Sequence, residues 1–79
     1  MLARAIATIG RVMELGTTTH PDDDWRDYRV RFHVARAERH LRLLRKGDAS
    51  EPHLEHAACR LLMALELTAS AVQVKVRPH

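Results

Sequence analysis

The residues best suited to chemistry gather on either side of one short Gly-Asp turn. His53 and His56 are three residues apart, a spacing that places two imidazoles on the same face of a helix. Glu51 precedes them, Asp48 belongs to the turn itself, and His40 lies in the segment before the turn. Mixed imidazole and carboxylate ligands suit zinc, manganese, iron or nickel, whereas magnesium prefers oxygen. The pattern therefore indicates a divalent metal site.

The same residues also have a structural interpretation. His-x-x-His pairs are common in helices, and Asp48 and Ser50 are residue types that cap helix ends. His40 could be a core histidine that is held by hydrogen bonds. Cys59 follows two small residues, so we expect it to pack in the core rather than to act as a nucleophile. Spacing alone leaves both interpretations of the histidines open.

Apolar residues recur three and four positions apart in the first part of the chain, which predicts two helices. The first is expected over residues 2–15 and to end at Gly16. The second is expected from Asp23 or Asp24, acting as N-cap, to Arg45, and to stop at Gly47. The expected core faces are Leu2, Ala5, Ile6, Ile9, Val12 and Met13 in the first helix and Val30, Val34, Ala37, Leu41 and Leu44 in the second, flanked by Trp25, Tyr28 and Phe32.

A third helix is expected from Ser50, another good N-cap, with Pro52 in its first turn. The short connection before it predicts that the second and third helices are antiparallel neighbours. Residues 72–76 alternate like a strand, and since a single strand cannot pair with itself they form either a frayed tail or an intermolecular edge. Residues 71–79 are therefore expected to be a tail outside a single domain of residues 1–70. The predicted fold is therefore all-α, a small antiparallel three-helix bundle. The expected apolar face of the third helix is Leu54, Ala57, Ala58, Leu61, Leu62, Leu65, Ala69 and Val72.

The length of 79 residues limits the size of the core. A chain this short buries only about 60% of the surface that it exposes when unfolded, and its one cysteine excludes an internal disulfide. We therefore expect a homo-oligomer, with a bound metal as the other remedy. No run of about 18 apolar residues occurs, and Arg4 and Arg11 interrupt the first apolar segment. We expect no membrane association and a cytoplasmic location, which is the host cytoplasm if the chain is phage-encoded.

Positive charge is concentrated in the middle of the chain. Residues 25–46 carry eight cations against two carboxylates, a net charge of +6, whereas the segments before and after carry −2 and −1. Such a segment attracts the phosphates of a nucleotide or nucleic acid, or an acidic protein. The alternative is that its arginines only form a solvated helix face.

The chain carries a series of short motifs in a fixed order. They are Leu-Ala-Arg-Ala-Ile (2–6), Glu-Leu-Gly (14–16), Asp-Trp-Arg (24–26), Tyr28, Arg-His-Leu (39–41), Gly-Asp (47–48), Glu51 and His-Leu-Glu-His-Ala-Ala-Cys (53–59). This order resembles the phage-encoded domain named for dATP/dGTP diphosphohydrolases, which is similar to the all-helical MazG-type nucleotide pyrophosphohydrolases. The resemblance covers residues 2–67, and its most specific part is the Arg-His-Leu, Gly-Asp and His-Leu-x-His-Ala run.

The resemblance implies hydrolysis of a deoxynucleoside triphosphate to a monophosphate and pyrophosphate. It implies a divalent metal, magnesium or manganese or another transition metal, that bridges the phosphates. By position it assigns substrate binding to Arg39 and to Trp25, the latter by stacking on a base or by packing. Catalysis is expected from Glu51 and Asp48, and Arg36 is a further expected substrate-binding residue. The resemblance assigns metal binding to His40, Asp48, Glu51, His53 and His56.

A second hypothesis follows from the ways in which the chain departs from that family. Its loop over residues 46–52 is shorter and less acidic than the family's, and the Glu-x-x-Glu and Glu-x-x-Asp motifs of MazG-type enzymes do not occur. Each lost carboxylate weakens magnesium binding. The chain would then be a relative that has lost its chemistry, a non-catalytic phage-type binding protein with an anti-defence or regulatory role. Its basic helix would dock on an acidic protein or a nucleic acid.

Overall fold

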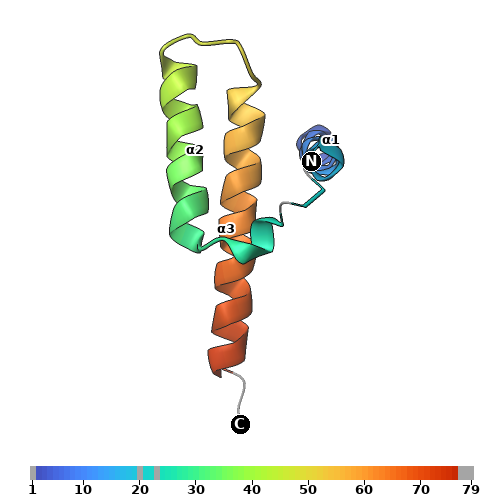
Figure 1. Cartoon of the computed structure of the whole chain (residues 1–79), viewed down its shortest axis with the longest axis vertical. Coiled ribbons are helices and arrows are strands. Elements are labelled where there is room, and N and C mark those ends of the chain that lie inside the picture. Colours follow the sequence, from blue (N-terminus) through green and yellow to red (C-terminus); the bar gives the residue numbers. More distant parts are fainter. Residues whose placement is uncertain (1, 20, 23, 77–79) are drawn as a thin grey trace.

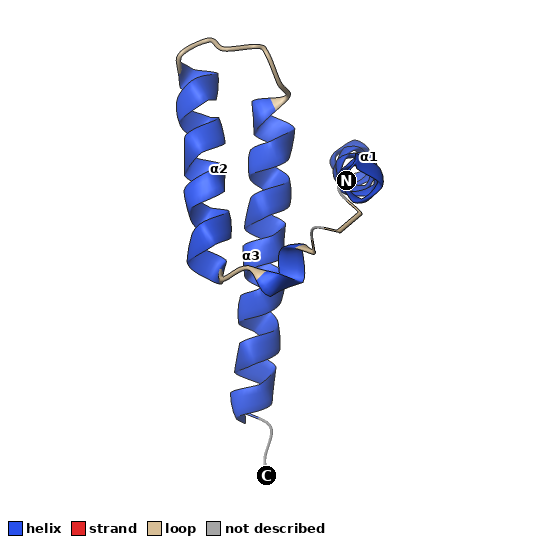
Figure 2. Cartoon of the chain, in the orientation of Figure 1, coloured by secondary structure: helices blue, strands red, loops and turns tan. Residues whose placement is uncertain are grey.

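The computed structural model describes residues 2–19, 21–22 and 24–76, with side chains as far as Ser70. The elements in chain order are α1 (Ala3–Thr19), the short 3₁₀ helix η1 (Trp25–Asp27), α2 (Val30–Arg45) and α3 (His53–Val76). No strand occurs in these residues, as Figure 2 shows. The predicted all-α, three-helix fold is confirmed.

The two helices that carry the histidines form an antiparallel hairpin (Figure 1). Its turn ends α2 as a Schellman motif, in which the Gly47 amide donates to Leu44 O at 3.0 Å and the Asp48 amide donates to Leu43 O at 3.1 Å. Gly47 has a φ of 85°, a left-handed conformation that other residues adopt at a cost. The prediction that Gly47 ends the second helix is confirmed, and the motif fixes Asp48 at the start of the loop.

The first helix is longer than predicted and lies across the hairpin rather than along it, so Figure 1 shows it end-on. The prediction that it ends at Gly16 was wrong. No positive φ occurs at Gly16, and the helix continues to Thr19. The hydroxyls of Thr17 and Thr18 donate to the carbonyls of Met13 and Glu14, four residues earlier, each at 3.1 Å.

The predicted core face of α1 is only partly used. None of its described residues is buried, and Leu2 and Ile6 are 67% and 66% exposed. Only the second half of the predicted stripe, Ile9, Val12 and Met13, is partly covered. A helix that crosses its neighbour at one point covers that point alone, which explains why the first half of a stripe of the right period stays exposed.

The second helix begins later than predicted. Asp24 caps η1 instead, where its Oδ1 accepts a hydrogen bond from the Arg26 amide at 3.0 Å. Extended backbone at Tyr28 and Arg29 then separates η1 from α2. Asp23, the other predicted cap, lies outside the described residues.

The interface between α2 and α3 is built from small residues and imidazoles. Ala37 and Ala57 of the predicted faces are buried as expected, but the larger aliphatic residues of those faces are not. The buried residues of α2 are His33, Ala37 and His40, whereas Val34 and Leu44 are exposed. Alanine lets two helices approach closely, and the imidazoles find hydrogen bonds, so no described buried side-chain polar atom lacks a partner. On α3 the buried residues are His53, Ala57, Cys59 and Ala64, and the exposed leucines are Leu54, Leu61, Leu62 and Leu65.

Both ends of α3 differ from the prediction. Ser50 does not cap the helix, which begins at His53; the Ser50 hydroxyl donates to Asp48 Oδ2 at 2.7 Å instead. Residues 72–76 continue α3, so the expected strand-like alternation was wrong, and residues 77–79 of the expected tail lie outside the described part. None of the described helices combines the length and the apolar character that crossing a membrane requires. The expected homo-oligomer stays a prediction.

Candidate functional site

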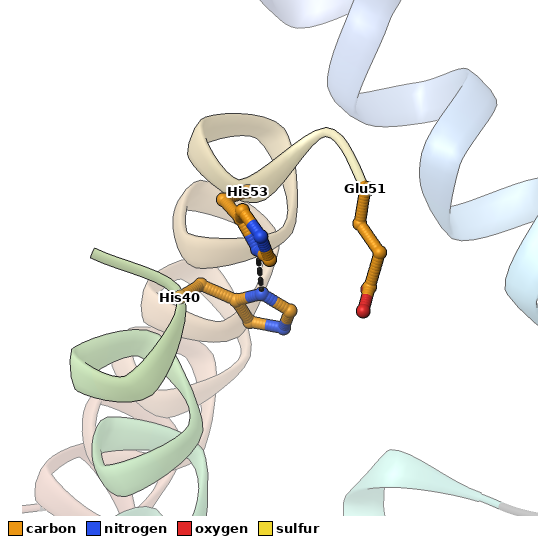
Figure 3. Close-up of side chains that lie close together, drawn as sticks. All are labelled: His40, Glu51 and His53. Carbon is orange, nitrogen blue, oxygen red and sulfur yellow. Dashed lines mark hydrogen bonds between the residues drawn. The ribbon is translucent and has the colours of Figure 1, made fainter. Parts of the chain in front are cut away.

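Two buried histidines meet where α2 and α3 face each other at the closed end of the hairpin. His40 comes from the last turns of α2 and His53 is the first residue of α3. Their Nδ1 atoms are 2.9 Å apart, and the two residues are 8% and 1% exposed. Figure 3 shows the two rings joined by this contact, with the Glu51 side chain extending from the loop toward them.

The opposite nitrogen of His53 is held by Asp48. His53 Nε2–H donates to Asp48 Oδ2 at 2.5 Å, and the Schellman turn places the carboxylate there. In neutral His53 the Nδ1 atom is then an acceptor, so His40 Nδ1–H is the donor between the rings. Hydrogen bonds from His53 and then from Ser50 lower the pKa of Asp48, which is therefore ionised at neutral pH.

Glu51 and His56 complete the cluster on the loop side. Glu51 Oε1 lies 3.3 Å from His56 Nδ1, and the His56 ring packs edge-on against His40 with 5.1 Å between centroids. One ligand atom each from His40, Glu51 and His53 lies within 4.8 Å of the other two. The loop thus brings the Glu51 carboxylate close to the paired imidazoles, while Asp48 holds the far nitrogen of His53, Nε2.

The surroundings of His40 favour its neutral form. Burial is the largest cause that lowers its pKa, and the neighbouring His56, His53 and Arg39 add to this, whereas Glu51 acts in the opposite direction. Neutral imidazole is the form that binds a metal ion or accepts a proton. His40 is therefore neutral at neutral pH and keeps a nitrogen lone pair.

The cluster opens onto a cavity of about 380 Å³ between α1, η1 and α3. His40 and His56 line it on the cluster side, and Trp25 and Tyr28 contribute aromatic walls. Apolar side chains of α1, among them Met13, cover it from the other side. A volume of this size accommodates a small molecule.

The structure brings most of the sequence-predicted site residues together. Four of the five predicted ligands, His40, Glu51, His53 and His56, surround the open side of the cluster. Asp48 lies beside them but faces the far nitrogen of His53. Of the predicted substrate-binding residues, Trp25 lines the cavity.

The two predicted substrate-binding arginines lie elsewhere. Arg39 and Arg36 are exposed on α2 and are not among the residues that line the cavity. Arg36 packs its guanidinium over the Phe32 ring at 5.1 Å. Arg39 directly precedes His40 in the sequence, and adjacent residues on a helix point in different directions.

Sequence reasoning missed Arg60 and His33. Arg60 lines the cavity, and its Nη1 lies 3.1 Å from the Nδ1 of His33, a fully buried histidine. The spacing of four between His56 and Arg60 was the available signal, because it puts both on one helix face. No signal in the sequence distinguishes the buried His33 from an exposed histidine.

Comparison with known proteins gives a single, family-level result. Neither the curated proteins nor the solved structures include a significant match to this chain. One family model, described as dATP/dGTP diphosphohydrolase, N-terminal, matches residues 1–77. The chain belongs to this dATP/dGTP diphosphohydrolase N-terminal family.

Proposed function

We propose that this protein hydrolyses deoxynucleoside triphosphates to monophosphates and pyrophosphate with the help of a divalent cation. The observation that carries the proposal is the cluster of His40, Glu51 and His53 beside a cavity large enough for a small molecule. Family membership supports the reaction class, since the family is named for the hydrolysis of dATP and dGTP.

The donor atoms of the cluster fit a transition-metal ion. Zinc–nitrogen bonds are about 2.0–2.1 Å long, so neighbouring nitrogen ligands of one ion lie about 3.0–3.4 Å apart. The separation of 2.9 Å between His40 Nδ1 and His53 Nδ1 is close to this range, and a carboxylate oxygen of Glu51 would supply the third ligand. Asp48 would orient His53 through its other nitrogen, as carboxylates commonly do behind metal-binding histidines.

This donor set favours manganese, zinc or another transition metal over magnesium, because two of the three ligands are nitrogen. A bound cation would neutralise phosphate charge and polarise the phosphorus centre that water attacks. The mutual contact of His40 and His53 holds their two Nδ1 atoms close together. A cation bound by both atoms would replace the proton that His40 Nδ1 donates.

His56 is the residue best placed to accept the proton from water. It lines the cavity, and the Glu51 carboxylate 3.3 Å from its Nδ1 would stabilise the imidazolium that forms. Water oxygen forms a bond to a phosphorus, the bond from that phosphorus to the departing pyrophosphate oxygen breaks, and the water proton passes to His56 Nε2. Glu51 would thus serve the reaction through both of its oxygens.

Product analysis tests the proposal directly. Each of the four deoxynucleoside triphosphates is incubated with purified protein and either Mn²⁺ or Mg²⁺, and the products are separated by anion-exchange chromatography. We expect monophosphate and pyrophosphate in equal amounts, and faster release with Mn²⁺. The absence of products with every nucleotide at high protein concentration would contradict the proposal, and diphosphate with free phosphate would contradict the assigned bond.

A second candidate function is favoured by the outer face of α2. The helix carries a single acidic residue, Glu38, and none of the ion pairs within the described residues involves an α2 cation. The exposed cations are Arg31, Arg36, Arg39, Arg42 and Arg45. This face would dock on a polyanion such as a nucleic acid, with or without nucleotide hydrolysis.

Reversal of two charges tests the second function separately. Arg42→Glu combined with Arg45→Glu should abolish binding to a labelled single-stranded oligonucleotide in fluorescence anisotropy, and binding of the unaltered protein should weaken steeply as salt rises. Binding that does not depend on salt would exclude this function. Neither residue lines the cavity, so the hydrolysis assay should not change.

A further inference from the structure

We propose that Arg60 is the anion-binding residue of the cavity, where it holds phosphate oxygens of the nucleotide, and that His33 positions it. The identity of the anion as a nucleotide phosphate rests on the proposed function. The anion site itself rests on the geometry around Arg60.

Arg60 lies on the same face of α3 as His56 and one turn further along. Four residues of an α-helix correspond to about 6 Å along the axis. Both side chains line the cavity, together with His40. A chain of phosphates that begins at the histidine cluster and runs along α3 would therefore reach Arg60 next, and the planar guanidinium is suited to paired contacts with phosphate oxygens.

The guanidinium is fixed by a fully buried histidine. His33 is 0% exposed, and its Nε2–H donates to the carbonyl oxygen of Trp25 at 2.9 Å. That leaves His33 Nδ1 as an acceptor, and Arg60 Nη1 donates to it at 3.1 Å. The guanidinium carbon also lies 5.6 Å from the centre of the Phe32 ring. An arginine with five N–H donors can keep this contact and bind an anion.

The same contacts connect the arginine to the aromatic wall of the cavity. The Trp25 carbonyl accepts a hydrogen bond from His33. The His33 ring also packs edge-on against the Trp25 and Tyr28 rings, with 6.3 and 6.2 Å between ring centroids. Trp25 and Tyr28 line the cavity with Arg60. A charged group thus stands beside flat apolar walls, an arrangement that matches a ligand with a phosphate chain and a ring system.

The test uses pyrophosphate as a probe in the presence of EDTA, so that no cation contributes. Trp25 is the only tryptophan in the sequence and lines the cavity, so its fluorescence should report occupancy. Arg60→Gln should raise the dissociation constant about tenfold, the usual effect of losing charged hydrogen bonds. The dissociation constant of Arg60→Lys should lie between those of Arg60→Gln and the unaltered protein, because lysine keeps the charge and loses the paired N–H donors of the guanidinium. Arg31→Gln, an exposed α2 change with the same loss of charge, is the matched control and should bind as the unaltered protein does.

Two substitutions at His33 separate positioning from simple packing. His33→Asn keeps an acceptor near the place of Nδ1, whereas His33→Gln keeps a donor near the place of Nε2. If His33 acts through Arg60, the asparagine variant should bind pyrophosphate more tightly than the glutamine variant, even where both are less stable. Arg60→Gln combined with His33→Gln should bind no more weakly than Arg60→Gln alone. Circular dichroism verifies that each variant is folded at the assay temperature.

The outcomes distinguish this inference from the proposed function. Weaker pyrophosphate binding by Arg60→Gln supports the anion site even if no nucleotide is hydrolysed. The inference is overturned if the unaltered protein does not bind pyrophosphate, if Arg60→Gln binds as Arg31→Gln does, or if nucleotides are hydrolysed with unchanged affinity in Arg60→Gln. Equal affinity of the two His33 variants overturns the positioning role.

Discussion

His40 Nδ1 and His53 Nδ1 face each other at 2.9 Å across the α2–α3 interface, so the two nitrogens share one proton in the neutral pair. Asp48 accepts from the other nitrogen of His53, which settles the direction of the contact: His40 donates and His53 accepts. A metal ion bound to both Nδ1 atoms would have to replace that proton. The pair therefore has a different proton arrangement with and without metal.

Nitrogen-15 NMR of the histidine rings should detect this change. Without metal, we expect the Nδ1–H tautomer for His40 and the Nε2–H tautomer for His53. Addition of Zn²⁺ should convert His40 to the Nε2–H tautomer, because its Nδ1 becomes a ligand. It should also shift the nitrogen-15 resonance of His53 Nδ1. His33 is the internal control, since its Nε2–H is held by the Trp25 carbonyl in either state. Retention of the Nδ1–H tautomer of His40 in saturating Zn²⁺ would rule out this ligand pair.

Removal of the carboxylate behind His53 should weaken the cation site without abolishing it. Asp48→Ala should raise the dissociation constant for Mn²⁺ or Zn²⁺ about 10–100-fold, the usual effect of losing such a partner. Asp48→Asn, which keeps an acceptor for His53 Nε2–H, should have a smaller effect. Isothermal titration calorimetry measures both dissociation constants. Glu55→Gln is the control, because it removes a nearby carboxylate that lies outside the three-residue ligand group. An unchanged constant in Asp48→Ala would show that Asp48 does not support the site.

Two glycine substitutions should change stability in opposite directions. Gly16 is helical with nothing near an added Cβ, so Gly16→Ala should raise the free energy of unfolding by about 0.5–1 kcal/mol. Gly47 also has open space but has a φ of +85°, so Gly47→Ala should lower it by about 1 kcal/mol or more. Urea unfolding followed by circular dichroism gives both values. A stabilising Gly47→Ala would contradict the assigned turn.

The Cys59 thiol should react slowly in the folded protein. It is buried, with its Sγ 3.8 Å from the Ile9 carbonyl of α1. Burial is the main cause that raises its pKa above the ordinary 9.0, and Arg60 acts in the opposite direction. At pH 8 to 9, iodoacetamide should therefore label the urea-unfolded chain much faster than the folded one.

The sign of the accompanying stability change follows from the same pKa. The unfolded chain loses the thiol proton near pH 9.0, before the folded chain does, so this group contributes stability that declines as the pH rises above 9.0. Cys59→Ser should remove most of that decline. Equal labelling rates for the folded and unfolded chains at pH 8 would show that α1 does not cover this part of α3.

The order and type of the helices could be predicted because periodic apolar residues and two strong signals agree. Gly47 followed by Asp48 ends α2 as expected, and the short turn makes α2 and α3 antiparallel. Gly16 misled the prediction because glycine ends a helix only where the chain takes a positive φ, which nothing in the sequence specifies there. Residues 72–76 misled it because a short alternating run is also compatible with the last turns of a long helix.

The proximity of the candidate ligands was predicted more accurately than the core. His40, Glu51, His53 and His56 were expected together and lie together, since one turn and helical spacing are enough to place them. The core was predicted only in part: Ala37 and Ala57 are buried as expected and His40 as one interpretation held, whereas His33 and His53 were not placed in the core. Hydrogen bonds from His33 to the Trp25 carbonyl and from Arg60 to His33 make such burial favourable, and these partners come from other elements. Long-range pairing of this kind is not visible in a single sequence.

The central claim is that Glu51 and the paired histidines carry metal-dependent nucleotide hydrolysis. Pyrophosphate release from dATP with Mn²⁺, compared between Glu51→Gln and Glu55→Gln, tests it most directly, because both changes remove one carboxylate near the start of α3 and only Glu51 belongs to the cluster. We predict that Glu55→Gln retains the activity of the unaltered protein and that Glu51→Gln loses at least about a hundredfold in kcat/KM. Equal activity of the two variants, or no activity in the unaltered protein, would contradict the account.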